Sequence, residues 1–182
     1  MSKSTKKLAL LGLTTAIAMA FAYVEALLPP LFSAVPGIKL GLPNIVNIFV
    51  LYKIGVWEAA AVSLVRMLAV SLLFGNPMTF AYSLAGATLS LIAMVLLKKI
   101  DSFSIVGVSV VGGVLHNVGQ ILLAMIVLGT AELGYYLIVL AIVGTIAGVF
   151  IGLCGFFAVK RIPLGKSDKS GRESDKTKSN KH

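Results

Sequence analysis

The sequence has 182 residues, of which 58% are hydrophobic and only 13% are charged. A soluble domain usually has about 25% charged and about 45–50% apolar residues. This composition excludes a water-soluble globule, a disordered chain and a disulfide scaffold, and it indicates an all-α integral membrane protein.

The net charge of +9 is concentrated at the two ends of the chain. Residues 1–7 contribute +3 and residues 160–182 contribute +5, which leaves +1 for residues 8–159. Basic ends suit cytoplasmic segments near anionic lipid headgroups. They do not form the basic folded face that nucleic-acid binding requires. We predict a cytoplasmic N-terminus (1–7), a membrane domain (8–159) and a disordered basic cytoplasmic tail (160–182).

Six apolar segments are candidates for membrane helices, each of which needs about 20 largely apolar residues. They are 8–28, 42–56, 57–74, 78–97, 103–128 and 134–159. The second segment is the shortest, and only the turn from Lys53 to Glu58 separates it from the third.

The distribution of basic residues predicts the orientation. With the N-terminus inside, 14 of the 16 lysines and arginines are cytoplasmic, the outer loops hold only Lys39, and Arg66 lies within a span. This asymmetry places both termini in the cytoplasm of a multi-pass plasma-membrane protein. It requires an even number of spans and so supports the short second helix.

The first predicted span, 8–28, also resembles a signal peptide. It has a basic start, and Ala18, Ala20 and Ala22 form small-residue pairs of the kind found at cleavage sites. Against this alternative, the apolar run continues to Leu28 without a polar region, and it is long enough to cross a membrane.

The same span carries two stripes of small residues on roughly opposite sides of the expected helix. One stripe is Gly12, Ala16 and Ala20, and the other is Thr14, Ala18, Ala22 and Glu25. Small residues allow helices to pack closely in lipid. One stripe can pack inside the bundle with Glu25 turned inward, which leaves the other for a partner membrane subunit. In the alternative arrangement both stripes pack inside.

The first outer loop, from Pro29 to Pro43, is rich in proline and glycine and contains Lys39. Asn44 follows it directly, and Asn47 lies one turn further on. The positive end of a helix dipole is then expected at the outer face beside Lys39. This arrangement favours an anionic or polar ligand entering from outside, although a plain connector with a solvated lysine is the alternative.

Arg66 lies near the middle of the third predicted span, where a charge costs about 2.5–3.5 kcal/mol on insertion scales. It is expected to face the bundle interior or a wet cavity. It either forms a buried ion pair or backbone cap, or it binds an anionic ligand, and Glu25 is the natural charge partner. In the fourth span, Asn76 suits a helix N-cap and Pro77 suits the first helical position.

The fifth predicted span contains His116, Asn117 and Gln120, and His116 shares a helix face with Gln120. These side chains either form hydrogen bonds between helices or line a substrate cavity. A metal site is disfavoured because the other histidine, His182, lies in the tail. The sixth span has glycines at 144, 148, 152 and 155, a stripe typical of close helix packing inside a bundle.

Several catalytic and nucleotide-binding motifs are absent. The sequence has no Gly-x4-Gly-Lys-Ser/Thr phosphate loop and no Gly-x-Ser-x-Gly nucleophile elbow. Asp101 is the only aspartate before the tail, so an aspartate-rich Mg²⁺–diphosphate site cannot be built. We therefore predict no catalytic residues, no cofactor and no metal, and a self-sufficient enzyme is disfavoured.

Four motifs, occurring in order within about residues 8–160, resemble the Gx transporter family. They are Pro36-Gly37-Ile38-Lys39-Leu40-Gly41-Leu42 with Asn44, Phe74-Gly75-Asn76-Pro77, Tyr82-Ser83-Leu84-Ala85-Gly86, and His116-Asn117-x-Gly119-Gln120. That family is often labelled heptaprenyl diphosphate synthase component I. It is grouped with the substrate-binding S components of energy-coupling factor (ECF) transporters.

The resemblance implies a six-helix S-component fold with a cavity that faces outward. Such proteins pass a small molecule inward by toppling in the membrane, driven by a coupling subunit and two ATPases. Their first helix carries an Ala-x3-Ala contact for the coupling subunit, which here is either Ala16/Ala20 or Ala18/Ala22. The synthase label implies a different role, that of an accessory subunit in polyprenyl diphosphate formation.

We therefore predict the S component of an ECF-type importer, which binds a small polar or anionic molecule. The alternatives are a non-catalytic membrane subunit in heptaprenyl or polyprenyl diphosphate synthesis, and a self-contained channel or secondary transporter. The candidate binding residues are Lys39, Asn44, Asn47, Arg66, Asn76, Tyr82, His116, Asn117 and Gln120, with Glu25 as charge partner.

Overall fold

The computed structural model describes residues 3–27, 41–74, 77–100 and 102–163. In these ranges the chain forms six α-helices and one 3-10 helix, without any strand. The all-α prediction is therefore confirmed. The elements are α1 (Lys3–Leu27), α2 (Asn44–Lys53), α3 (Val56–Phe74), α4 (Pro77–Lys98), α5 (Ile105–Leu128), η1 (Glu132–Tyr135) and α6 (Tyr136–Arg161).

Five segments of the described chain are long and apolar enough to cross a membrane: Ser4–Glu25, Val56–Leu73, Pro77–Lys98, Ile105–Leu128 and Glu132–Arg161. They support a multi-pass membrane protein and confirm five of the six predicted spans. In place of the second span, α2 has only 10 residues. At 1.5 Å per residue it is about 15 Å long, which is half of a typical hydrocarbon core.

The early end of α2 has a local cause. The backbone N–H groups of Ile54 and Gly55 both donate to the carbonyl of Val50, which closes the helix with a tight turn. The next helix then begins at Val56. Hydropathy could not reveal this end, because the apolar composition continues through the turn.

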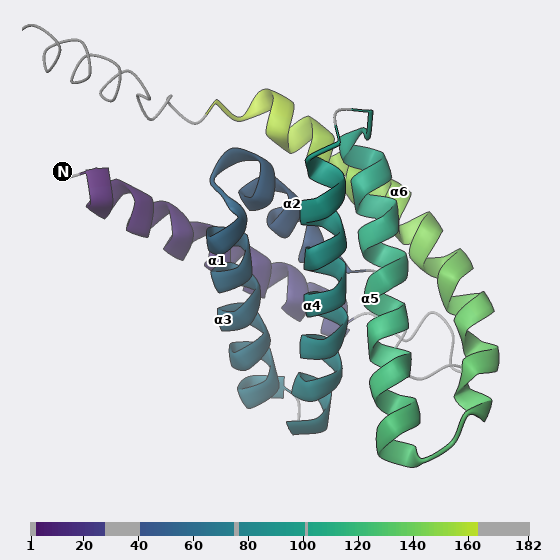
Figure 1. Ribbon diagram of the computed structural model, residues 1–182. Helices are drawn as coiled ribbons and strands as arrows, with labels where there is room; N and C mark the ends of the chain where they lie inside the picture. The colour runs from purple at the N-terminus through teal and green to yellow at the C-terminus, as the bar shows by residue number, and fades with distance from the viewer. Residues whose placement is uncertain (1–2, 28–40, 75–76, 101, 164–182) are drawn as a thin grey trace, which may run out of the picture.

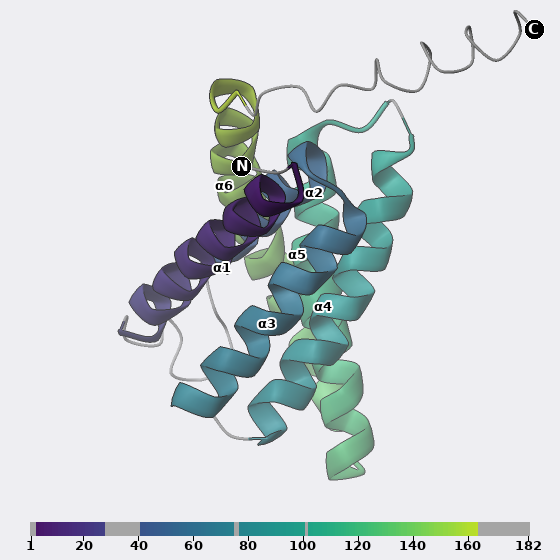
Figure 2. The same cartoon turned by 90° about the vertical axis from the view of Figure 1, so that its left-hand side faces the viewer.

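The helices form an antiparallel bundle in which α1 is strongly tilted against α3 (Figures 1 and 2). The start of α1, the α2–α3 turn, the α4–α5 connection and the end of α6 lie at one end of the bundle (Figure 1). We call it the basic end, because Lys53, Lys98, Lys99, Lys160 and Arg161 lie at these positions. The end of α3, the start of α4 and the α5–α6 connection lie at the opposite end.

Two polar contacts join elements at the basic end. Lys7 of α1 forms an ion pair with Glu58 of α3. The Lys98 ammonium at the end of α4 donates to the backbone carbonyl of Leu51 at 2.6 Å. These contacts link α1 to α3 and α4 to α2 at the basic end.

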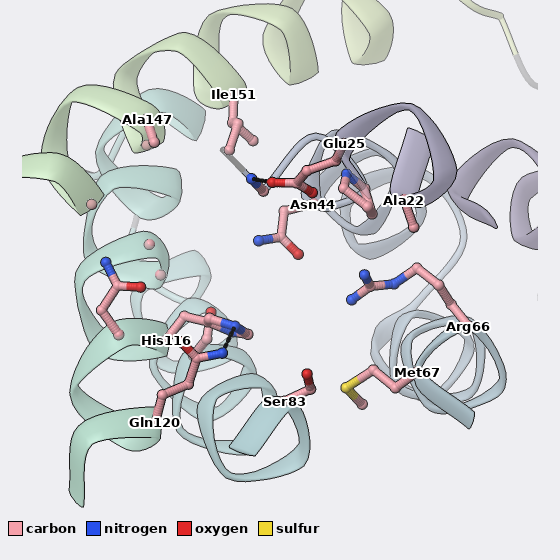
Figure 3. Close-up of a pocket in the computed structure, with 18 of the residues that line it drawn as sticks. Ala22, Glu25, Asn44, Arg66, Met67, Ser83, His116, Gln120, Ala147 and Ile151 are labelled. Atoms are coloured by element: carbon pink, nitrogen blue, oxygen red, sulfur yellow. Dashed lines mark hydrogen bonds between the residues drawn. The ribbon is translucent and has the colours of Figure 1, made fainter. Parts of the chain in front are cut away.

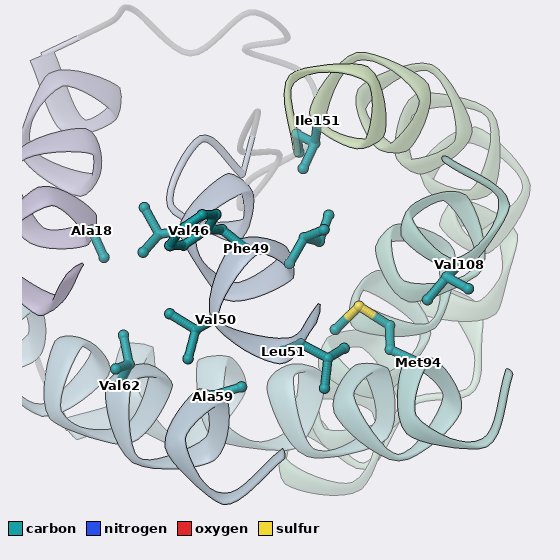
Figure 4. Packing of buried hydrophobic residues seen from close by; sticks show 11 residues of the cluster. Ala18, Val46, Phe49, Val50, Leu51, Ala59, Val62, Met94, Val108 and Ile151 are labelled. Carbon is teal, nitrogen blue, oxygen red and sulfur yellow. The ribbon is translucent and has the colours of Figure 1, made fainter. Parts of the chain in front are cut away.

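The apolar core is centred on α2, which packs among α1, α3 and α6 (Figure 4). All six residues from Val46 to Leu51 are buried. Ala18 of α1 and Ala59 and Val62 of α3 complete the packing around them. Because α2 is short, this core fills only part of the length of the bundle.

Glycines bring α4, α5 and α6 into close contact. A Cβ atom at Gly119 of α5 would lie 2.8 Å from the carbonyl oxygen of Ala85 in α4. A Cβ atom at Gly148 of α6 would lie 2.7 Å from the Cα atom of Val110 in α5. Gly144 and Gly152 of α6 also face the α5 backbone, so the interpretation of this stripe as a contact inside the bundle is confirmed.

The chain ends differ in part from their predicted boundaries. Helix α1 begins at Lys3, so most of the segment 1–7 is helical rather than a separate extension. Helix α6 continues to Arg161, past the predicted end of the last span at residue 159. The predicted disorder of the tail concerns positions beyond 163, which lie outside the described residues.

Candidate ligand pocket

A cavity of about 160 Å³ is lined by residues of all six α-helices (Figure 3). The first two turns of α2, with Asn44 and Ile48, contribute one of its walls. An apolar cavity of about 150 Å³ holds benzene, whereas pockets for drug-sized ligands are about 300–1,000 Å³. The cavity therefore suits a small molecule.

Arg66 of α3 is the one cationic side chain among the described residues that line the cavity, and its guanidinium points into it (Figure 3). The Nε atom is fully buried and has no hydrogen-bond partner among the described residues. Glu25 also lines the cavity and acts on Arg66 electrostatically. No nitrogen–oxygen pair joins these two residues within 4.0 Å. The cavity thus contains one positive and one negative side chain that do not neutralise each other by contact.

Glu25 connects the end of α1 to the segment that leads into α2. Its carboxylate accepts a hydrogen bond from the backbone N–H of Gly41. Gly41 has a φ of 75°, a left-handed conformation that favours glycine. A Cβ atom there would also approach Asn44 Nδ2 at 3.1 Å and Ile151 Cδ1 at 3.2 Å. The glycine therefore allows this segment to pass close to the cavity.

His116 and Gln120 form a polar wall on α5, opposite Arg66 (Figure 3). Their Nε2 atoms are 3.2 Å apart, as their spacing on one helix face predicts. Gly86 of α4 leaves space for the imidazole, because a Cβ atom there would lie 3.1 Å from His116 Cε1. The absence of a side chain on α4 thus helps to position this pair.

Asn117 also lines the cavity, but its amide is used in a contact between helices. Its Nδ2 atom donates to the backbone carbonyl of Leu140 in α6 at 2.9 Å. Asn117 therefore forms the hydrogen bond between helices that the sequence left open, while a substrate-binding role for His116 and Gln120 stays a prediction.

Two further candidate binding residues, Asn47 and Tyr82, are described and are not among the residues that line the cavity. Asn47 is buried in the core beside Asn44, with its Nδ2 3.4 Å from Asn44 Oδ1. Its own Oδ1 has no partner in the described part of the chain. Tyr82 is not among the cavity residues. Lys39 and Asn76 lie outside the described residues.

Five hydroxyl side chains of the cavity were not anticipated from the sequence. They are Ser71, Thr79, Ser83, Ser90 and Ser109. A serine in a membrane helix can bond to its own backbone, so its presence alone indicates no ligand. The seven-residue spacing of Ser83 and Ser90, which places both on one face of α4, was the available signal.

The cavity contains groups for recognition: a guanidinium, a carboxylate, amides, hydroxyls and an imidazole. Apolar side chains such as Met67, Val70 and Ile151 form the rest of its walls. In the described ranges, no group of three His, Cys, Asp or Glu side chains is arranged to hold a metal ion. Such a set of groups can bind and orient a small polar ligand.

The two small-residue stripes of α1 face different surroundings. Thr14 and Ala18 are buried, and Ala22 lines the cavity together with Glu25. The other stripe, Gly12, Ala16 and Ala20, is exposed on the outer side of the bundle. Of the two Ala-x3-Ala pairs, only Ala16/Ala20 is therefore accessible to a partner in this structure.

Comparison with protein families gives one assignment. The family model described as heptaprenyl diphosphate synthase component I matches residues 14–157, which include all six α-helices in whole or in large part. Searches of curated proteins and of solved structures return no significant match.

Proposed function

Because the chain belongs to the heptaprenyl diphosphate synthase component I family, we propose that it acts as a membrane subunit and not as an enzyme on its own. Its role is that of the substrate-binding component of an ECF-type importer in the plasma membrane. It binds a small polar or anionic molecule from outside and passes it inward together with a coupling subunit and ATPases.

The observation that carries this proposal is the cavity with the Arg66 guanidinium, whose buried Nε has no hydrogen-bond partner in the described part of the chain. A buried arginine is costly in a membrane, and a ligand that pairs with it would offset this cost. Arg66 has no hydrogen bond or ion pair to any described residue, and its guanidinium points into a cavity of suitable size.

The position of the cavity supports uptake from outside. Its polar wall, formed by His116 and Gln120, runs from the middle of α5 away from the α4–α5 connection and hence away from the basic end. The positive-inside rule places the basic end in the cytoplasm. The lining on α5 extends from Ser109, near the basic end, to Gln120, so the cavity occupies the middle of the bundle and its His116–Gln120 wall lies on the outer side of that lining in this orientation.

The exposed stripe of α1 supports a partner within the membrane. Gly12, Ala16 and Ala20 form a surface on which another helix can approach closely. The sequence has no phosphate loop, so in this proposal ATP is bound by the partner ATPases.

Purification from native membranes tests the proposal. The tagged chain is extracted gently, and the copurifying proteins are identified by mass spectrometry. We expect a transmembrane coupling subunit and ATPases, and we expect both to be lost when Ala16 and Ala20 are replaced together by leucine. Ala61→Leu, at an exposed alanine of α3, is the matched control and is expected to retain the partners.

The family description favours a second candidate, a non-catalytic component of heptaprenyl or polyprenyl diphosphate synthesis. The same purification distinguishes the two roles. Recovery of a prenyl diphosphate synthase without a coupling subunit would replace the importer proposal with this one. The lack of an aspartate-rich motif means that catalysis would then be performed by the partner.

A further inference from the structure

Two buried serines of the cavity have no hydrogen-bond partner in the described part of the chain. Ser90 of α4 and Ser109 of α5 line the cavity and are only 5% and 4% exposed. Neither hydroxyl bonds to another described residue, and neither oxygen is sealed off from the cavity. Thr88 and Thr145, by contrast, donate their hydroxyls to carbonyls of their own helices. Because a buried polar group without a partner is costly, the two serines indicate a ligand group or an ordered water beside them.

The cavity is drawn out along α5, and Ser109 stands at one end of this lining. Ser109, Gly112, His116 and Gln120 follow one another at spacings of three and four residues, which places them on one face of the helix. At 1.5 Å per residue, this lining is about 16 Å long. A volume of about 160 Å³ that extends along such a lining is narrow. A slender, extended ligand therefore suits the cavity better than a compact one.

The walls around the two serines are neutral. A Cβ atom at Gly112 of α5 would lie 2.8 Å from the Met94 sulfur and 3.2 Å from Ser90 Oγ. A Cβ atom at Gly152 of α6 would lie 3.3 Å from Ser109 Oγ. The described cavity residues of α4, α5 and α6 include no Lys, Arg, Asp or Glu. A neutral hydroxyl group, which donates and accepts as a serine does, is therefore a better match here than a charged group.

We propose that Ser90 and Ser109 form a second binding subsite of the cavity, the serine subsite, which takes a neutral hydroxyl group of the ligand. The guanidinium of Arg66 points into the same cavity and can hold a carboxylate through two parallel hydrogen bonds (Figure 3). The ligand is then a hydroxylated carboxylate with an extended carbon chain between its two polar groups. Glu25, which accepts from Gly41 and interacts electrostatically with Arg66, is not required to contact it. This inference rests on the proposed function and specifies its substrate class.

The test measures thermal unfolding of the purified chain in lipid nanodiscs, because a ligand that binds only the folded protein raises the unfolding midpoint. The probes are 4-hydroxybutanoate and 6-hydroxyhexanoate. Butanoate and hexanoate lack the hydroxyl, 1,4-butanediol and 1,6-hexanediol lack the carboxylate, and 4-aminobutanoate and 6-aminohexanoate carry an ammonium in place of the hydroxyl. We expect at least one hydroxy acid to bind about three- to tenfold more tightly than its parent carboxylate, which is the gain from one or two hydrogen bonds, and more tightly than its diol and amino counterparts.

Serine variants assign the hydroxyl to its subsite. Ser90→Ala and Ser109→Ala are each expected to lower the advantage of the hydroxy acid over its parent carboxylate, and the double variant is expected to abolish it. Both variants are expected to fold, because each removes a hydroxyl without a partner among the described residues. Thr88→Val, which removes a hydroxyl from an exposed position of α4, is the matched control and is expected to keep the full advantage. Arg66→Gln is expected to weaken both carboxylates by roughly tenfold or more.

Three results would overturn the inference. If the hydroxy acids bind no more tightly than their parent carboxylates, or keep their advantage in the double serine variant, the serine subsite is wrong while the proposed function stands. If an amino carboxylate binds more tightly than its hydroxy counterpart, the ligand class is wrong. If no probe stabilises a chain that copurifies with a coupling subunit, the inference fails and the importer role stands. Recovery of a prenyl diphosphate synthase without a coupling subunit would instead overturn the proposed function, and with it the substrate class.

Discussion

Replacing Gly119 by alanine tests the packing that holds α4 against α5. The added Cβ would lie 2.8 Å from the Ala85 carbonyl oxygen and 2.9 Å from the Gly86 Cα atom. Carbon atoms prefer a separation of about 3.5–4.0 Å, and both obstacles belong to the α4 backbone, so the two helices must move apart. Overpacking of this kind costs about 1–3 kcal/mol.

Gly12, in contrast to Gly119, lies at a position where an added methyl group would not clash with a neighbouring helix. A Cβ atom there would meet no atom of the described residues within 4 Å. Alanine at this exposed helical position is expected to stabilise the protein by about 0.5–1 kcal/mol, because glycine loses more backbone entropy on folding. The two Gly→Ala substitutions add the same single methyl group, so the structure predicts a difference of about 1.5–4 kcal/mol that arises from location alone.

Denaturant unfolding of both variants in mixed micelles, with the wild type alongside, measures this difference. A second readout is the mobility of each variant in size-exclusion chromatography, which shows whether Gly119→Ala folds at all. The packing described for α4 and α5 would be refuted by a neutral Gly119→Ala. It would also be refuted if the two substitutions had equal effects.

Three further substitutions examine other contacts by the same unfolding measurement. Ser104→Ala removes the side-chain oxygen that caps the first turn of α5, and it is expected to cost about 1 kcal/mol, whereas Ser102→Ala is expected to be neutral. Asn117→Ala removes the bond to the α6 backbone and is expected to cost about 0.6–2 kcal/mol; no loss would show that this bond does not hold the helices together. Glu58→Gln breaks the partly exposed ion pair with Lys7, so a cost of at most about 1 kcal/mol that shrinks with added salt is expected.

The helices were largely predictable because membrane helices follow a simple length and polarity rule. Five of the predicted spans match described helices to within a few residues at most boundaries. The exception, α2, ends where two N–H groups share the carbonyl of Val50. Such an end depends on local backbone geometry, which composition does not report.

The candidate site was predictable only where a polar residue was costly in its span. Arg66 and His116 were identified because a membrane interior penalises unpaired polar groups, and both line the cavity. Tyr82 was a candidate only through a motif resemblance and does not line the cavity. Asn47 differs from Asn44 only in helical phase, which turns it into the core instead of the cavity.

The packing of the two small-residue stripes of α1 was also only partly predictable from the sequence. The sequence indicated two small-residue faces, and the helical period placed them on roughly opposite sides. Which face turns inward depends on the neighbours α2 and α3, which bury Ala18 and leave Ala16 exposed. Only the assembled bundle contains that information.

The most direct test of a ligand-binding role is to identify what the cavity holds in the cell. The chain and its Arg66→Lys variant are purified gently from native membranes and denatured, and the released small molecules are compared by mass spectrometry. The account predicts that the wild type releases one small polar compound in about equimolar amount and that the variant releases far less of it. Identical profiles from the two proteins, at equal yield and equal thermal stability, would contradict a ligand site at Arg66.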